Sequence, residues 1–173
     1  MSKKENFRDL LLKMIKTLVV LFTLSAIGWF VDLLPFAKSL PFLSAKLPVG
    51  VFLGSVVSLL ILITLVLFGA EAAPAIDGLL DFLPKAGQVF GNLIKIGAGL
   101  FAYTSFQPAI FPFIPDFEWA YQSVFLGLIL FFVARAGLLM YAASENISRF
   151  LLKFLDPYRT GEAGQTKEVQ PPN

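Results

Sequence analysis

The sequence predicts an all-α integral membrane protein, and three observations lead to this fold class. Hydrophobic residues make up 57% and aromatic residues 14% of the 173 residues, against 15% charged residues, a more apolar balance than that of soluble globular domains. The apolar residues gather in runs that match the roughly 20 residues a helix needs to cross a bilayer. Basic residues collect mainly beside these runs. We therefore expect four transmembrane helices, at about residues 10–31, 49–70, 87–111 and 119–143.

The first crossing is expected to begin at the membrane surface. Residues 5–16 place apolar side chains on one helical face and charged ones on the other, which is typical of an interfacial helix. A basic N-terminus before an apolar run is similar to a signal peptide, but no small-x-small cleavage site follows, so this helix should be retained. Pro35, Pro41 and Pro48 then predict an apolar surface loop rather than a helix.

Two more amphipathic helices are expected to lie on the membrane. Residues 74–84 form a short apolar segment bounded by prolines, in the loop after the second crossing. Residues 144–156 follow the last crossing and alternate apolar with charged positions at helical spacing. These elements and the crossings make one domain over residues 1–156. The polar residues 157–173 predict a disordered tail.

Two of the expected crossings carry small residues at intervals of four, which allow another helix to approach closely. These residues are Gly50, Gly54 and Ser58 in one crossing and Gly87, Gly91 and Gly99 in the next. Packing within one chain is the favoured interpretation of the first set, and dimerisation is the alternative. Lys95 shares a face with the second set, so it should face a crevice or a neighbouring helix.

The distribution of basic residues predicts the orientation. Four crossings put both termini on one side, together with the loop that holds Lys85. The opposite side receives Lys38 and Lys46 as its basic residues, whereas both terminal segments are rich in Lys and Arg. The positive-inside rule then places both termini in the cytoplasm and the protein in the cytoplasmic (inner) membrane.

Three charged residues are expected in the cytoplasmic half of the bundle: Glu71, Lys95 and Arg135. In one hypothesis they form an intramembrane cluster, in which Glu71 neutralises one base and the other attracts a lipid phosphate or a partner's carboxylate. In the alternative, both long basic side chains extend to the interface and Glu71 is solvated. Charges near helix ends favour the alternative.

The chain has no Cys and no His, which removes thiolate nucleophiles, imidazole ligands and the commonest general base. We therefore expect no enzymatic activity, no metal and no cofactor. A net charge of +2 without a contiguous basic patch argues against nucleic-acid binding.

Three functions remain as hypotheses. The favoured one is a non-catalytic accessory or scaffold subunit of a larger membrane complex, whose partners are the bilayer and other membrane subunits or copies of itself. The second is a homo-oligomeric channel or small transporter, with an anion as the substrate to test because acidic residues are absent deep in the membrane. The third is a lipid-binding or membrane-shaping protein, with anionic lipid as a partner.

Overall fold

The computed structural model describes residues 3–42, 47–80 and 83–155, and these residues are organised in helices, which confirms an all-α protein. The four long helices are α1 (Lys3–Leu33), α3 (Val49–Leu79), α4 (Ala86–Ile110) and α5 (Glu118–Leu155). Three short helical segments lie in the connections, namely α2 (Pro35–Ser39), η1 (Phe111–Phe113) and η2 (Pro115–Phe117).

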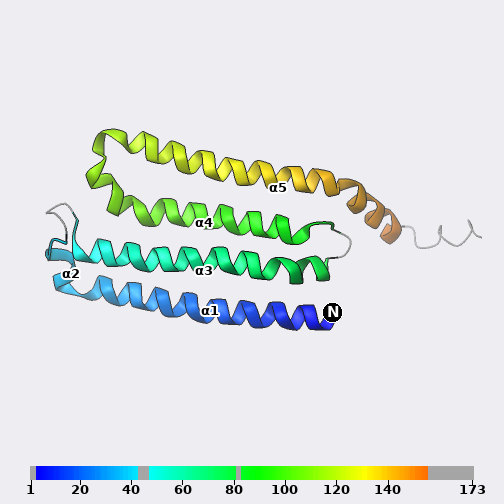
Figure 1. Ribbon diagram of the computed structural model, residues 1–173, viewed down its shortest axis with the longest axis horizontal. Helices are drawn as coiled ribbons and strands as arrows, with labels where there is room; N and C mark the ends of the chain where they lie inside the picture. The colour runs from blue at the N-terminus through cyan, green and yellow to red at the C-terminus, as the bar shows by residue number, and fades with distance from the viewer. Residues whose placement is uncertain (1–2, 43–46, 81–82, 156–173) are drawn as a thin grey trace, which may run out of the picture.

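The long helices lie side by side in a single row, in the order α1, α3, α4, α5, and each runs antiparallel to the one before it (Figure 1). The extensive contacts join α1 to α3, α3 to α4, and α4 to α5. Helices α1 and α5 are therefore the two edges of the row and do not close a bundle. No described element of the chain lies across either broad face of the row.

Three segments of the described structure are long and apolar enough to cross a membrane: Lys3–Leu33, Val49–Leu79 and Pro115–Ser144. A membrane location follows from these three. Helix α4 is not among them, because its glycines and polar residues, such as Asn92 and Lys95, lower its hydropathy. Its 25 residues nevertheless extend for about 38 Å, which exceeds a hydrocarbon core of about 30 Å.

The helices meet through small side chains, while the large apolar ones point outward. The buried positions include many alanines, and no large side chain among the described residues is fully buried. By contrast, Phe22 is 78% exposed and Leu138 is 70% exposed. Small contacts inside and large apolar groups outside suit a protein whose solvent is lipid, where close backbone packing replaces a hydrophobic core.

The prediction of a separate surface helix at residues 74–84 is wrong for residues 74–80 and 83–84, which the structure describes. Helix α3 continues through Pro74 and ends at Leu79. Proline inside a helix removes one hydrogen bond, but packing offsets that loss here. Ala72 precedes Pro74 and Ile76 follows it, and both buried side chains pack with Ala86 of α4. Leu10 of α1 packs against the same cluster. Tertiary contacts therefore extend the helix past the proline.

The loop between the first two crossings also differs from the prediction. Residues 35–39 form the short helix α2 rather than irregular loop. Pro35 occupies its first turn, where the missing N–H has no intrahelical partner to lose, and the fixed φ of proline suits a helix. Ala37 of this helix is fully buried against α3.

The predicted interfacial segments continue the long helices. Residues 5–16 belong to α1, and residues 144–155 belong to α5, which bends near its end (Figure 1). Because α1 is 31 residues and about 46 Å long, a part of it must extend beyond the hydrocarbon core. The predicted tail, 157–173, lies outside the described residues.

Candidate functional site

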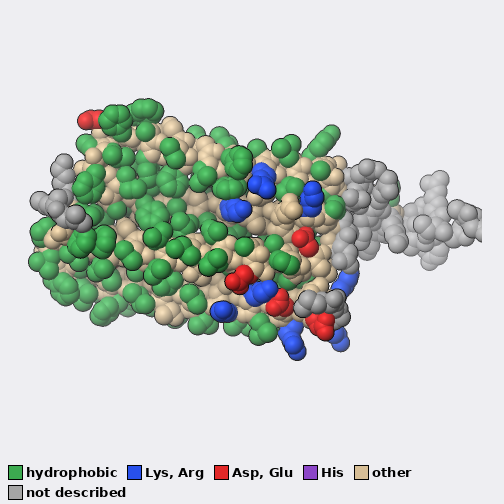
Figure 2. Space-filling model, in the orientation of Figure 1, with side chains coloured by type: hydrophobic (Ala, Val, Ile, Leu, Met, Phe, Trp, Pro, Cys, Tyr) green, Lys and Arg blue, Asp and Glu red, His purple; other side chains and the backbone are tan. Residues whose placement is uncertain are grey.

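Charged side chains gather at one end of the row. Figure 2 shows most of the Lys, Arg, Asp and Glu side chains of this face on the half that holds the start of α1 and α4, whereas hydrophobic side chains predominate on the other half. The candidate site lies along α4 where the charged half meets the apolar half, and it is bordered by α3 and α5.

The start of α4 is fixed closely against the end of α3. A Cβ at Gly87 would overlap the carbonyl oxygen of Ala73, so only glycine allows this approach. The backbone N–H of Gly87 donates to Oδ1 of Asp77 at 2.7 Å, which satisfies one of the unpaired amides in the first turn of α4. Lys85, just before the helix, has φ 63°. Gly69 gives α4 a second close approach, since its Cβ would lie 3.0 Å from Ile94.

Lys95 and Arg135 line one open cavity of about 320 Å³, formed between α3, α4 and α5. Asn92 lines it too, and is only 3% exposed. No hydrogen bond to the Asn92 side chain is found among the described residues, so its amide is available to whatever occupies the cavity. Gly87 and Gly91, two of the predicted small residues, line the same cavity and leave it room.

Glu71 is not part of this arrangement. Its side chain is exposed, it does not line the cavity, and it forms no ion pair with Lys95 or Arg135 in the described structure. Its carbonyl oxygen instead accepts a hydrogen bond from Nζ of Lys13, at 3.0 Å, and Lys13 is paired with Asp9 at 2.7 Å. The predicted cluster is thus divided: the structure brings the two bases together and places Glu71 on the α1 side of α3.

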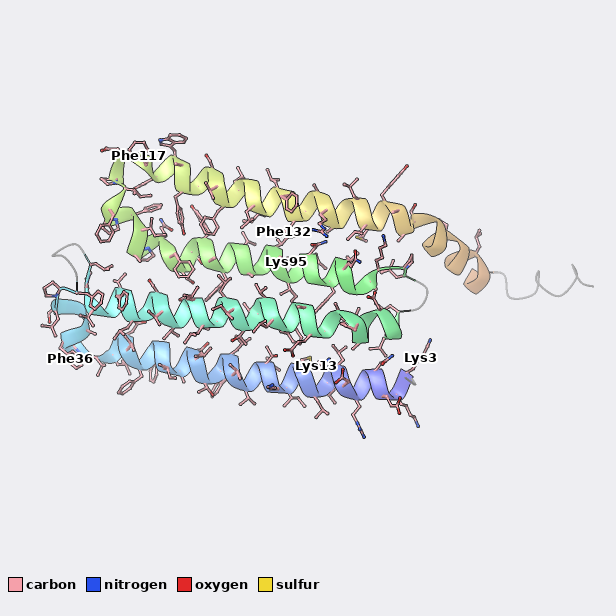
Figure 3. The ribbon with its side chains drawn as sticks, in the orientation of Figure 1. Lys3, Lys13, Phe36, Lys95, Phe117 and Phe132 are labelled. Atoms are coloured by element: carbon pink, nitrogen blue, oxygen red, sulfur yellow. The ribbon has the colours of Figure 1, made fainter. Side chains whose placement is uncertain are left out.

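A second cavity lies next to the first and is apolar. It has a volume of about 420 Å³, and its lining is made by leucine, valine, alanine, glycine and phenylalanine side chains apart from Lys95. Val66 and Lys95 line both cavities, so the two cavities are adjacent there. Nζ of Lys95 lies 5.5 Å from the ring centroid of Phe132, a cation–π contact between α4 and α5 that marks the junction (Figure 3). Gly99 lies on the floor of the apolar cavity.

The other predicted small-residue face has a different environment. Gly50 packs against Ala37, whose carbonyl oxygen would lie 3.0 Å from an added Cβ. Gly54 has no neighbour within 4 Å of such a Cβ, and it borders a third cavity together with Ser58. This cavity, about 370 Å³, is also lined by Asp32 and Ser105. One helix contact and one open cavity with a mixed polar and apolar lining therefore share the face that the sequence predicted.

Sequence reasoning missed Asn92 as a site residue. It precedes Lys95 by three positions, and residues three apart lie on one helical face, so the spacing could have indicated it. In the part of the chain that the structure describes, no three His, Cys, Asp or Glu side chains come together as a set of metal ligands.

Comparison of the chain with known protein families, with characterised proteins and with solved structures finds no match.

Proposed function

We propose that this protein is a non-catalytic integral membrane protein that acts as an accessory or scaffold subunit of a larger membrane complex. The observation that supports this function is the single row of long helices (Figure 1). A four-helix bundle that is complete in itself packs its first and last helices together around a common core. Here α1 and α5 are the opposite edges of the row, and the described helices leave two broad faces open to other chains.

The cavity beside Gly54 strengthens the argument. Hydroxyl groups that face lipid without partners are unfavourable, because hydrocarbon offers no hydrogen bonds. Ser58 and Ser105 line this cavity, together with Asp32 from the end of α1. A helix of another subunit that brings its own polar groups would satisfy them, and the missing side chain at Gly54 leaves it space.

We include α4 as the fourth crossing. It lies between α3 and α5, both of which hold candidate membrane spans, and it is packed against each of them. A helix between two spanning neighbours occupies the same depth as they do. Four crossings return both termini to one side, where the Lys- and Arg-rich segments then favour the cytoplasm under the positive-inside rule. The membrane would be the cytoplasmic (inner) membrane.

The test is to identify what leaves the membrane with this chain. The tagged protein, expressed at its natural level, is extracted in mild detergent and examined by native mass spectrometry. We expect a complex of defined stoichiometry with a different protein. Recovery of this chain alone, as a monomer or as a homo-oligomer, would contradict the proposal; a discrete homo-oligomer would instead favour the channel hypothesis, with a pore built between copies.

A matched pair of variants locates the contact. Gly54→Leu projects into the open cavity, and its Cβ would have no described atom within 4 Å apart from the adjoining part of α3. This variant should therefore fold, but the amount of partner recovered with it should fall several-fold. Gly97→Leu is equally uncrowded on α4 and borders none of the three cavities described above, so it should retain the partner. If the two variants recover equal amounts of the partner, the cavity is not part of the interface.

A further inference from the structure

We propose that the two adjacent cavities along α4 form one amphiphilic groove that binds a phospholipid with an anionic headgroup. The polar arm of this groove is the 320 Å³ cavity, and the apolar arm is the 420 Å³ cavity. The inference does not depend on the accessory-subunit function, because a lipid site can exist on a protein with or without a partner.

The polar arm has the chemistry of a phosphate site. Arg135 supplies a planar guanidinium that can hold two phosphate oxygens, and Lys95 supplies a second positive charge. The nearly buried Asn92 adds an amide without a partner in the described structure. No Asp or Glu side chain lines this arm, and none of the described residues forms an ion pair with either base. Two positive charges at this depth are therefore not neutralised by the described residues.

The apolar arm has the dimensions of one acyl chain. From Lys95 to Phe106 its length along α4 is about 16 Å, which is close to half of a hydrocarbon core of about 30 Å and thus to the thickness of one leaflet. The floor of the arm consists of small residues of α4, namely Ala98, Gly99 and Ala102, and these leave room for a chain. Leu62 of α3 and Phe125 of α5 form its sides.

The position of the apolar arm next to the polar arm favours a lipid over a free anion or a protein carboxylate. A free anion would use the polar arm and leave the apolar arm empty, and a carboxylate on a partner helix would leave the acyl-sized arm unexplained. An anionic phospholipid fills both, with its phosphate at Lys95 and Arg135 and a chain beyond Phe132. Because the helices form an open row, a lipid can enter the groove sideways from the bilayer.

The test measures lipid binding to the purified full-length protein. Phosphatidylglycerol and phosphatidylcholine with identical acyl chains are titrated into the detergent-solubilised protein, and bound lipid is counted by native mass spectrometry. We expect one tightly retained phosphatidylglycerol and at least a tenfold preference for it. Lys95→Gln and Arg135→Gln should each weaken the binding of phosphatidylglycerol about tenfold, because a hydrogen bond to a charged group typically contributes about that much to affinity. Lys95→Arg should retain it.

Matched controls separate the groove from general surface charge and from misfolding. Lys16→Gln removes an exposed base of α1, outside the groove, and should leave binding unchanged. Leu128→Trp blocks the apolar arm and should reduce the retention of both lipids, whereas Leu130→Trp, two residues away and outside the groove, should not. Both leucines are largely exposed, at 43% and 56%, so neither tryptophan has to enter a packed core.

Several outcomes would overturn the proposal. Equal retention of the two lipids would show that the charges do not select a headgroup. An equal loss with Lys16→Gln would assign the effect to net surface charge. Displacement of phosphatidylglycerol by millimolar inorganic phosphate, with no effect of Leu128→Trp, would show a free-anion site. If Lys95→Gln and Arg135→Gln are both monodisperse and bind phosphatidylglycerol as well as the parent protein, the polar arm is excluded as the headgroup site.

Discussion

Oδ1 of Asp77 accepts a hydrogen bond from the backbone N–H of Gly87 across 2.7 Å, and this bond joins the last turn of α3 to the first turn of α4. The residue before α4, Lys85, does not cap the helix with its side chain. The carboxylate therefore comes from a different helix, and its negative charge lies at the positive end of the α4 dipole. This contact fixes the connection that positions α4, and α4 carries the floor of the groove.

We predict that Asp77→Ala lowers the stability of the protein by about 1 kcal/mol, the usual effect of losing a helix cap. The midpoint of thermal unfolding in detergent, followed by the loss of the folded peak in size-exclusion chromatography, measures the change. Asp77→Asn keeps an acceptor oxygen and should retain most of the stability. If the asparagine variant unfolds as early as the alanine variant, the hydrogen bond to Gly87 is not what stabilises this end.

The close approach at Gly87 gives a second prediction. Gly87→Ala puts a methyl group against the carbonyl oxygen of Ala73, so α3 and α4 must separate, and we expect a destabilisation of about 1–3 kcal/mol, as for other overpacked sites. Gly97→Ala is the control, because its Cβ meets no atom within 4 Å. Alanine favours a helix over glycine by about 0.5–1 kcal/mol, so this variant should be as stable as the parent or more stable.

Thermal unfolding of the two variants in the same detergent tests this pair. Opposite shifts of the midpoint are expected. A Gly87→Ala protein that is as stable as Gly97→Ala would show that the helices can separate at that point without cost, and the glycine would then have no packing role.

A third prediction concerns the hairpin between α4 and α5. The hydroxyl group of the buried Tyr121 donates to the carbonyl oxygen of Tyr103 at 2.7 Å, and the two rings stack with centroids 5.6 Å apart. Tyr121→Phe keeps the ring and removes the hydrogen bond, which should cost about 1 kcal/mol. Tyr141→Phe is the control, because Tyr141 is 80% exposed. Unfolding midpoints that fall equally in both variants would contradict a specific role for the Tyr121 hydroxyl group.

Composition and apolar runs were enough to predict an all-helical membrane protein and the approximate positions of its long helices, because run length and hydropathy are local properties of the chain. Helix ends were less predictable. Pro74 indicates a break when only its neighbours in sequence are considered, whereas the packing of Ile76 against Ala86 continues the helix past it. That contact joins residues on two different helices, so no local pattern reveals it.

The candidate site, too, was predictable from the sequence only in part. The depth of Lys95 and Arg135 along their helices predicted that the two bases could meet, and they line one cavity. Depth alone also placed Glu71 in the predicted cluster. However, depth does not determine which side of a helix a residue occupies, and Glu71 lies on the side of α3 that faces Lys13 of α1. The order of helices in the row decides which faces meet. Because this order is a tertiary property, the sequence could not exclude Glu71 from the cluster.

The last prediction concerns whether α4 crosses the membrane. Because the chain has no Cys, single cysteines can be introduced and labelled with a membrane-impermeant maleimide in bacterial spheroplasts. With four crossings, Ser39→Cys and Phe117→Cys should be labelled from outside, and Lys4→Cys and Thr166→Cys only after permeabilisation, because both termini are expected in the cytoplasm. Ser39 and Phe117 are exposed in the structure, so the label can reach them. With three crossings, Thr166→Cys would be labelled from outside and Phe117→Cys only after permeabilisation, whereas the labelling of Ser39→Cys and Lys4→Cys would be the same as with four crossings. That pattern would exclude α4 as a span.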